Sequence, residues 1–387
     1  MRTIYLDYNA TTPAALPVVQ AMEPFLKEYF GNASSLHGAA REPRKALRDA
    51  RRSLAALLGA ADENSIVFTS GGTESNNAVL RSALASTGKR RIVTSSIEHS
   101  SILKPAEQLE KKGCEVVRLS VDASGQISME ELRRVLTPDT ALVSLMSANN
   151  ETGIFFPLEA AAQIIKERGV LLHVDAVQSI GKHPLDLKKS QIDYLSLSGH
   201  KFYGPKGVGA LYIKPGAAFE PLITGGSQER GRRGGTENIP GIAGLGKASE
   251  LVAQDLTEEI ERLKGLRLRF EEQITTECAG VDIAGRNAAR LPNTTLALFQ
   301  GVDAEALLFA LDGEGVACSS GSACMSGARD PSHVLTAMGY DRGTALSAIR
   351  FSFGRFTQPE ELEETAVILK QVLQRLRALP GKAAAGS

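Results

Sequence analysis

Two residues near the middle of the chain could together bind an aldehyde cofactor. Lys201 follows Ser198, Gly199 and His200 rather than lying on a charged helix face, and Asp175 ends an apolar run. A lysine amine can hold an aldehyde as a Schiff base, and an ionised aspartate can keep a pyridine nitrogen protonated so that the ring accepts electrons. Together, Lys201 and Asp175 predict a pyridoxal phosphate enzyme.

Each of these residues also has an ordinary structural explanation. Asp175 could cap a helix, with Gln178 incidental, although the Gln178 amide could equally reach the phenolic oxygen of the ring. Lys206, in a turn between a proline and a glycine, competes with Lys201. Burial would lower the pKa of a free Lys201 amine and make it a base. The pairing of Lys201 with Asp175 favours the cofactor site.

A glycine-rich segment at 69–77 could hold a phosphate. It follows a short β-rich run and opens a helix, so free amides beside Gly72 and Thr73 would converge on an anion. An ordinary turn capped by Thr73 explains the same residues equally well. The segment has neither the ending of a P-loop nor a Rossmann fingerprint.

Two other side chains could contact the cofactor or its substrate. His99 comes just beyond a β-rich run, where an imidazole could stack on a flat ring and exchange protons, although a lone histidine is commonly structural. Arg350 lies in an apolar run, where either a substrate carboxylate or an internal salt bridge would satisfy it. The basic, glycine-containing segment 230–238 suits a solvated turn or a loop that reaches a neighbouring subunit.

Cys324 lies in a loop of serine, glycine and alanine, which cannot anchor itself by packing. Such a loop could carry a thiol between a pocket and the surface, as a group that accepts and hands on an atom must move. Cys318 is attached to an apolar run and is expected to be an inert buried thiol. The two cysteines lack the second Cys/His pair of a zinc site.

Alternating β-rich and helical segments must position these groups. The alternation predicts an α/β fold with a mostly parallel sheet of the seven-stranded type, covered by helices. Ligands bind beyond the carboxyl ends of the strands in such sheets, and His99, Asn149, Asp175 and Lys201 follow such runs. We expect strands at 66–69, 91–94, 116–119, 141–145, 171–174 and 194–197, and helices at 101–112, 128–136 and 158–168.

A long charged helix, expected at 246–278, marks a change of pattern. We predict a large cofactor-binding domain at 15–250 and a smaller α+β domain at 251–387, which includes residues 1–14 and carries the cysteine loop. A last helix at 360–379 precedes a tail with the composition of a frayed end.

The composition limits the classes of partner. The chain has 387 residues, 43% of them hydrophobic, with 44 basic and 44 acidic side chains, so no net charge attracts nucleic acid or an anionic membrane. No apolar stretch reaches the length of a signal core or a membrane span. Four cysteines in so long a chain suggest free thiols. We therefore expect a soluble, cytoplasmic protein that binds small molecules or neutral protein surfaces.

With these residues assembled, the chain closely resembles the cysteine desulfurases of the NifS/IscS type, within the class V, fold-type I pyridoxal phosphate enzymes. The resemblance runs nearly end to end and is carried by residues 5–13, 31–37, 71–77, 98–99, 149–153, 175–178, 198–201, 233–238 and 319–324. Met325 departs from the threonine of many relatives, and 234–235 differ modestly before Thr236. We expect Met325 to tune activity rather than abolish it, and residues 234–235 to affect the orientation of the phosphate contact by Thr236.

The resemblance implies roles for individual residues. Lys201 would bond the cofactor, Asp175 would pair with the ring nitrogen, Gln178 would meet the ring oxygen and His99 would stack on the ring. The implied phosphate ligands are Gly72 and Thr73 with their amides, Ser198, His200, and Thr236 from the other subunit of a homodimer. Asn149 and Arg350 would grip the carboxylate of L-cysteine.

The resemblance also implies the reaction. Cys324 would take the sulfur of L-cysteine as a persulfide, with Lys201 and His99 moving protons, and alanine would leave. The sulfur would pass to an iron–sulfur scaffold protein, with Cys324 a transient iron–sulfur ligand and no resident metal. A selenocysteine lyase, or another class V lyase or aminotransferase, is the nearest alternative. A sulfur-relay scaffold with a structural pyridoxal phosphate site is an alternative of a different class.

Overall fold

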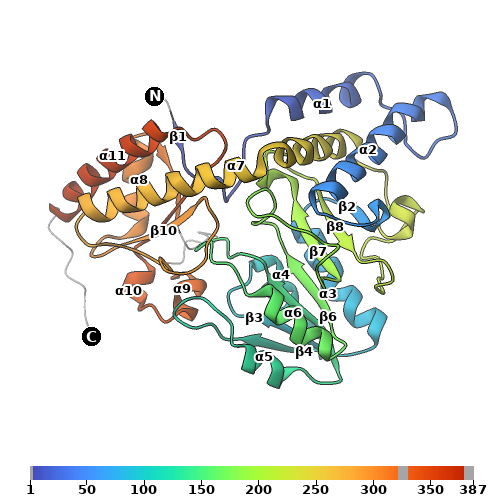
Figure 1. Ribbon diagram of the computed structural model, residues 1–387, viewed down its shortest axis with the longest axis horizontal. Coiled ribbons are helices and arrows are strands. Elements are labelled where there is room, and N and C mark those ends of the chain that lie inside the picture. The colour runs from blue at the N-terminus through green and yellow to red at the C-terminus, as the bar shows by residue number, and fades with distance from the viewer. Residues whose placement is uncertain (1–2, 321–329, 379–387) are drawn as a thin grey trace.

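The larger of two main sheets has seven strands, and a computed structural model describes it within residues 3–320 and 330–378 (Figure 1). The spatial order is β2 (Ile66–Thr69), β8 (Gly209–Ile213), β7 (Tyr194–Ser198), β6 (Leu171–Asp175), β5 (Thr140–Met146), β3 (Arg91–Ser95) and β4 (Glu115–Leu119). From β7 to β4 all neighbours are parallel, whereas β8 is antiparallel to both β2 and β7. The predicted α/β class is confirmed.

Both faces of this sheet are buried except along the edge strand β4, which explains why the other strands are nearly continuous apolar runs. All seven residues of β5 are buried, and its neighbouring side chains Leu142 and Val143 belong to different cores because successive side chains point to opposite faces. Helices α3 (Gly72–Thr87) and α4 (Ser100–Glu110) cover the Leu142 face, and α6 (Leu158–Glu167) covers the Val143 face.

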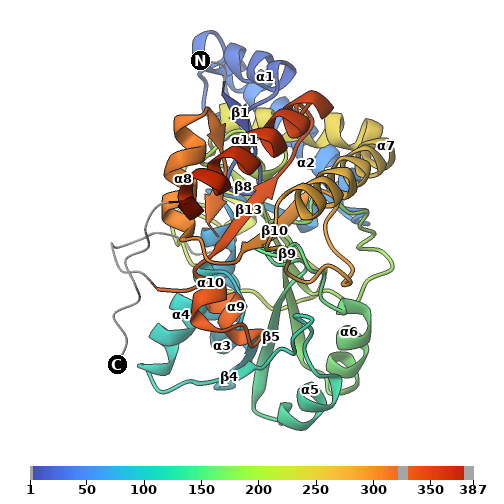
Figure 2. The same ribbon diagram turned by 90° about the vertical axis from the view of Figure 1, so that its left-hand side faces the viewer.

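The second sheet is antiparallel and has its own core. Its order is β12 (Ser319–Ser320), β13 (Ala348–Ser352), β10 (Thr294–Phe299) and β9 (Val281–Ile283). In this core, Phe270 packs edge to face against Phe351 and Phe353. Figure 2 shows this sheet beside α8 (Ala304–Gly313) and α11 (Pro359–Ala378). The short strand β1 (Ile4–Tyr5) pairs in parallel with β11 (Val316–Ala317).

Helix α7 (Ile239–Glu277) runs along both cores and reaches from α1 (Leu16–Lys27) and α2 (Arg41–Leu57) to α11 (Figure 1). It begins seven residues before the predicted start at 246. Asn238 caps it by accepting a hydrogen bond from the Gly241 amide, and its early glycines allow close packing. A Cβ on Gly246 would lie 2.5 Å from the Cα of Ala50 on α2. Backbone geometry departs from helical at Asp255. The domain boundary at 250 remains a prediction.

The shorter elements are α5 (Met129–Val135), α9 (His333–Ala337) and α10 (Arg342–Ala345), with single 3₁₀ turns between other segments. In the described ranges, no helix combines the length and apolar character needed to cross a membrane.

Candidate active site

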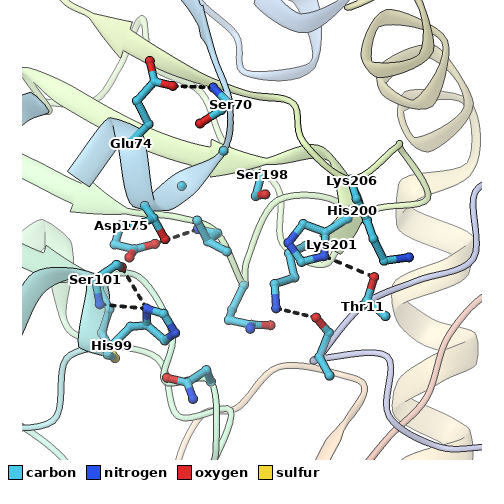
Figure 3. A pocket seen from close by; sticks show the side chains of 18 of the residues that line it. Thr11, Ser70, Glu74, His99, Ser101, Asp175, Ser198, His200, Lys201 and Lys206 are labelled. Atoms are coloured by element: carbon cyan, nitrogen blue, oxygen red, sulfur yellow. Dashed lines mark hydrogen bonds between the residues drawn. The ribbon is translucent and has the colours of Figure 1, made fainter. Parts of the chain in front are cut away.

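A cavity of about 510 Å³ opens at the carboxyl ends of β6 and β7 (Figure 3). Its size is typical of small-molecule sites. The cavity gathers eight of the nine residues predicted to bind the cofactor: Gly72, Thr73, His99, Asp175, Gln178, Ser198, His200 and Lys201. These residues come from segments up to 129 positions apart, so the fold alone brings them together.

The glycine-rich segment presents the open N-terminus of α3 to this cavity. Gly71 is the N-cap residue with a φ of 152°, and none of the side chains that the structure describes caps the first amides of the helix, so Thr73 does not cap it. A Cβ on Gly72 would lie 2.5 Å from Cγ2 of Val177, so glycine lets the helix approach the turn after β6. Free amides and the helix dipole make this end of α3 suitable for a phosphate.

Asp175 ends β6 with its side chain 6% exposed. Its Oδ2 accepts a 2.7 Å hydrogen bond from Nδ2 of Asn76, and its Oδ1 accepts a 3.0 Å hydrogen bond from the Val177 amide. Asn76 also donates to Oγ of Ser101. The carboxylate is therefore fixed from two sides at the wall of the cavity, in a turn rather than at a helix cap.

His99 is the N-cap residue of α4, and Figure 3 shows its ring beside Ser101. The Ser101 amide donates to Nδ1 of His99 at 3.1 Å, and Oγ of Ser101 lies 2.8 Å from the same atom. Because Nδ1 is an acceptor, we assign the ring proton to Nε2. Burial lowers the pKa of His99, against the opposing charge of Asp175, and so favours the neutral ring.

Lys201 follows β7 in a 3₁₀ turn, Gly199–Lys201. Its Nζ donates to the carbonyl oxygens of Asn9 at 2.6 Å and Ala10 at 2.9 Å. Burial lowers the pKa of this amine to about 8, with a further contribution from Arg350. The competing Lys206 lines the same cavity but is exposed. Lys201 is therefore better placed than Lys206 to form the predicted Schiff base.

Arg350 and Asn149 already have partners within the chain. Arg350 donates to Oδ1 of Asp7 and to the Asn150 carbonyl, each at 2.8 Å. Asn149 is buried, accepts at Oδ1 from the amides of Glu151 and Thr152, and donates from Nδ2 to the Ile97 carbonyl. Neither lines the cavity, whereas Asn150 does. The salt bridge considered for Arg350 is present, and substrate binding by either residue stays a prediction.

Thr236 lies in an adjoining cavity of about 180 Å³, which shares Ser70 and Gly207 with the first. Two ion pairs hold its loop: Arg233 with Glu74, and a buried bidentate pair between Arg51 and Glu229. The structure thus places Thr236 near the predicted phosphate site, and its contribution across a dimer stays a prediction.

Cys324 lies outside the described residues. Cys318 is partly buried, and burial raises the pKa of its thiol, as expected for an unreactive cysteine. In ranges 3–320 and 330–378, no group of three or more histidine, cysteine or acidic residues could hold a metal ion.

Asn76 and Ser101 were not singled out from the sequence. They complete a hydrogen-bonded series that runs from Asp175 through Asn76 and Ser101 to His99. Asn76 lies one helical turn after Gly72, on the face of α3 that meets the cavity, and this spacing was a usable signal.

The described residues fit pyridoxal phosphate. The cavity joins uncapped amides at one wall, a fixed carboxylate at another and a lysine amine opposite. In addition, Oε1 of Gln178 is buried and accepts no hydrogen bond from the described residues. Such an atom calls for a partner in the site.

The fold and this site define a member of the class-V aminotransferase family, whose family model matches residues 4–365, and the chain belongs to that family. Within it, the chain is 51% identical over 378 residues to a cysteine desulfurase of Bradyrhizobium diazoefficiens, covering 97% of this chain and 95% of that protein. It is 48% identical over 380 residues to a cysteine desulfurase of Nostoc sp., with 98% and 95% covered.

A solved structure described as a NifS-like protein superposes with a TM-score of 0.91 at 38% identity, covering 97% of this chain and all of the other. The predicted family is therefore confirmed.

Proposed function

We propose that this protein is a pyridoxal phosphate-dependent cysteine desulfurase, which converts L-cysteine to L-alanine and transfers the sulfur to Cys324 as a persulfide. The observation that carries the proposal is the single cavity in which Lys201, Asp175 and His99 meet the uncapped N-terminus of α3. Full-length relatives named cysteine desulfurase support the same reaction.

The cofactor would be held from every side of the cavity. Lys201 would attach it covalently, Asp175 would pair with its ring nitrogen, Gln178 would contact its ring oxygen and His99 would cover one face. Its phosphate would meet the amides of Gly72 and Thr73, Ser198, His200, and Thr236 of the second subunit. When bound, the cofactor supplies an electron-accepting ring that acidifies the α-carbon of an attached amino acid.

Lys201 and His99 would move the protons of the reaction. With a pKa of about 8, an appreciable fraction of free Lys201 amine is unprotonated near neutral pH and can take the α-proton. His99, neutral and protonated at Nε2, can donate to a group in the cavity and recover the proton from a thiol. Arg350 and Asn149 would orient the substrate carboxylate.

The Cys324 thiolate would attack the sulfur of the bound substrate. An S–S bond forms, the C–S bond breaks, and its electron pair stays on carbon, which takes a proton. The products are alanine and a Cys324 persulfide, so the sulfur is oxidised, the carbon is reduced, and atoms and electrons balance without another reagent.

The persulfide would then pass to an iron–sulfur scaffold protein, with Cys324 as a transient iron–sulfur ligand, in the cytoplasm. We further propose a homodimer. Support comes from large apolar side chains at the α1 end of the molecule, where Leu26, Phe30 and Leu36 are exposed.

The test compares the Cys324→Ser variant with Cys318→Ser as the matched control. We expect Cys324→Ser to keep the absorbance of the bound cofactor and its spectral response to L-cysteine but to form no alanine, because the sulfur acceptor is missing. Cys318→Ser should keep both. Alanine formation by Cys324→Ser from L-cysteine would contradict the nucleophile, and a holoprotein that forms no alanine would contradict the activity.

A further inference from the structure

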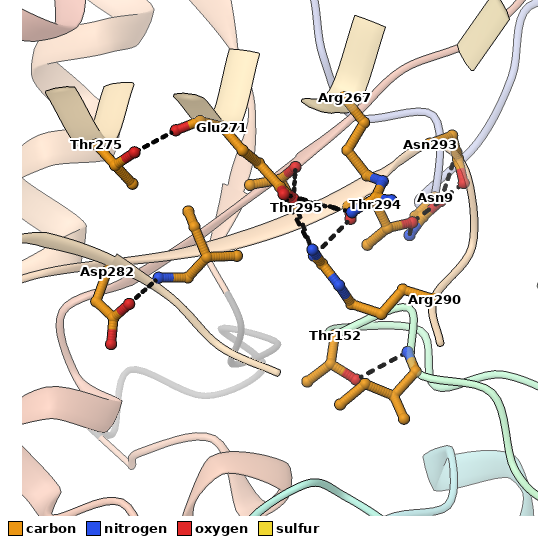
Figure 4. A network of polar contacts seen from close by, with 12 residues as sticks. Asn9, Thr152, Arg267, Glu271, Thr275, Asp282, Arg290, Asn293, Thr294 and Thr295 are labelled. Carbon is orange, nitrogen blue, oxygen red and sulfur yellow. Dashed lines mark hydrogen bonds and ion pairs between the residues drawn. The ribbon is translucent and has the colours of Figure 1, made fainter. Parts of the chain in front are cut away.

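Asn9 connects the second core to the lysine of the cavity, although nothing in the reaction above uses it. It lies between β1 and α1 and is only 1% exposed. Its side chain faces Asn293 and Thr294 of the second core (Figure 4), whereas its backbone carbonyl accepts a hydrogen bond from Lys201.

The side-chain amide of Asn9 is held at both of its polar atoms. Nδ2 donates to Oγ1 of Thr294 at 2.8 Å, and Oδ1 accepts from Nδ2 of Asn293 at 3.1 Å. The backbone amide of Asn9 donates to Oγ of Ser352 at 2.9 Å. Asn293, Thr294 and Ser352 are each fully buried, so water cannot replace these bonds cheaply.

The residues that hold Asn9 belong to a rigid buried network. Glu271 on α7 pairs with Arg267 and Arg290, and Arg290 also donates to the Thr294 carbonyl. Thr295, next along β10, donates to Oε1 of Glu271 at 2.9 Å. The buried Glu271 carboxylate keeps two guanidinium partners even when its contact to the Thr295 hydroxyl is removed, so these ion pairs continue to support Thr294 through Arg290.

On its other side, the Asn9 carbonyl accepts two hydrogen bonds from the cavity. Nζ of Lys201 donates at 2.6 Å, and Nε2 of Gln178 donates at 3.1 Å. The adjacent Ala10 carbonyl is 2.9 Å from the same Nζ. The position of the Asn9 backbone therefore fixes two acceptors for one amine.

We propose that Asn9 is a positioning residue for Lys201: its locked side chain holds the Asn9 and Ala10 carbonyls where they receive the amino group of Lys201 whenever that group is free. The free lysine would thereby stay beside the substrate as an oriented base. This inference rests on the proposed function, since only a lysine released during turnover needs such a site.

Asparagine suits this position because it supplies a donor and an acceptor on one short, planar group. Asn9→Ala would leave Oγ1 of Thr294 and Nδ2 of Asn293 without their Asn9 partners. Thr294→Val removes one of these contacts with little change of shape. Thr295→Val is the matched control, because it makes the same change at the next buried residue but breaks a contact to Glu271 instead.

The test measures the reactivity of Lys201 in the apoprotein, by the rate at which trace acetic anhydride labels it at each pH, read by mass spectrometry. Two carbonyl acceptors favour the charged amine, so their displacement should lower its pKa. If the pKa of Lys201 falls by one unit from about 8, the unprotonated fraction of its amine at pH 7 rises about fivefold. The other charged or titratable groups around the amine, which are Asp7, His99, Asp175, Lys182, His200, Lys206 and Arg350, remain in every variant.

We expect Asn9→Ala and Thr294→Val to be labelled several-fold faster than wild type at pH 7, with Thr295→Val unchanged. Circular dichroism checks the fold, and Thr294→Val carries the test if Asn9→Ala does not fold. The role of Asn9 would be overturned if the pH profile of Lys201 labelling were the same in all variants and wild type. It would also be overturned if Thr295→Val shifted that profile as much as Thr294→Val. Because the apoprotein is labelled, this result is independent of whether the holoenzyme forms alanine from L-cysteine.

Discussion

Asp7 would compete with a substrate carboxylate for Arg350, and Asp7→Asn tests whether Arg350 binds the substrate. Nη2 of Arg350 lies 2.8 Å from Oδ1 of Asp7, with the two side chains 8% and 19% exposed. Asparagine keeps the shape and an acceptor oxygen but removes the charge. A charge-assisted hydrogen bond exceeds a neutral one by about 1 kcal/mol, after allowance for the partial exposure of Asp7.

Weakening the contact between Arg350 and residue 7 by about 1 kcal/mol should strengthen L-cysteine binding about fivefold. The assay is the KM for alanine formation, together with the dissociation constant from the spectral change on adding L-cysteine. The Asp7 charge also raises the pKa of Lys201, so Asp7→Asn should move the acid limb of the rate profile to lower pH.

Asp255→Asn, which weakens the ion pair of Arg355 away from the cavity, is the control and should leave both constants unchanged. If KM in Asp7→Asn stays at the wild-type value or rises while the cofactor absorbance is intact, Arg350 does not bind the substrate carboxylate, and its pair with Asp7 is structural.

Two more outcomes are expected from buried charges. Arg51→Ala should lower the free energy of unfolding by about 3–5 kcal/mol, because it leaves Glu229 buried without its bidentate partner; urea denaturation measures this, and a loss below 1 kcal/mol would mean that water or another cation replaces Arg51. The single-turnover rate of alanine formation should rise with pH through about 8, because the lowered pKa of Lys201 makes its amine unprotonated above that value; a rate that rises only above pH 10, the ordinary lysine range, would exclude Lys201 as the base.

The strands of the large sheet were predictable because they are local features. Six expected strands agree with the observed bounds within one residue, since all except the edge strand β4 are largely buried apolar runs followed by polar or turn-forming residues. The start of α7 was not predictable in the same way. Gly241, Gly244 and Gly246 indicate a loop by propensity, but all three are helical here. A Cβ on Gly244 would clash with Met22 of α1 and one on Gly246 with Ala50 of α2, whereas a Cβ on Gly241 would meet the capping side chain of Asn238.

In the candidate site, too, the features set by local sequence were predictable, whereas those set by distant contacts were not. Residues after successive parallel strands must share one edge of the sheet, so the cavity around Asp175 and Lys201 followed from pattern alone. The partners of Arg350 and Asn149 could not be predicted from this pattern. Asp7 is 343 positions from Arg350, and the Asn149 side chain is occupied by amides of its own turn, which spacing does not reveal.

The N-terminal segment contacts both Arg350, the proposed substrate-binding residue, and Lys201, the proposed catalytic lysine. Asp7 pairs with Arg350 on β13, Asn9 accepts from Lys201, and both lie within three residues of each other on one short stretch of backbone. A substrate carboxylate that displaced Asp7 from Arg350 would remove a fixed contact two residues from the carbonyl that holds the amine. The hydrogen bonds of the Asn9 side chain to Thr294 and Asn293 would then keep the Asn9 carbonyl in place while Asp7 loses its contact with Arg350. On this reasoning Asp7→Asn combined with Asn9→Ala should lower the pKa of Lys201, read from the pH dependence of its acetic anhydride labelling, by more than the sum of the two single falls, because each single variant leaves one of the two anchors of this segment intact.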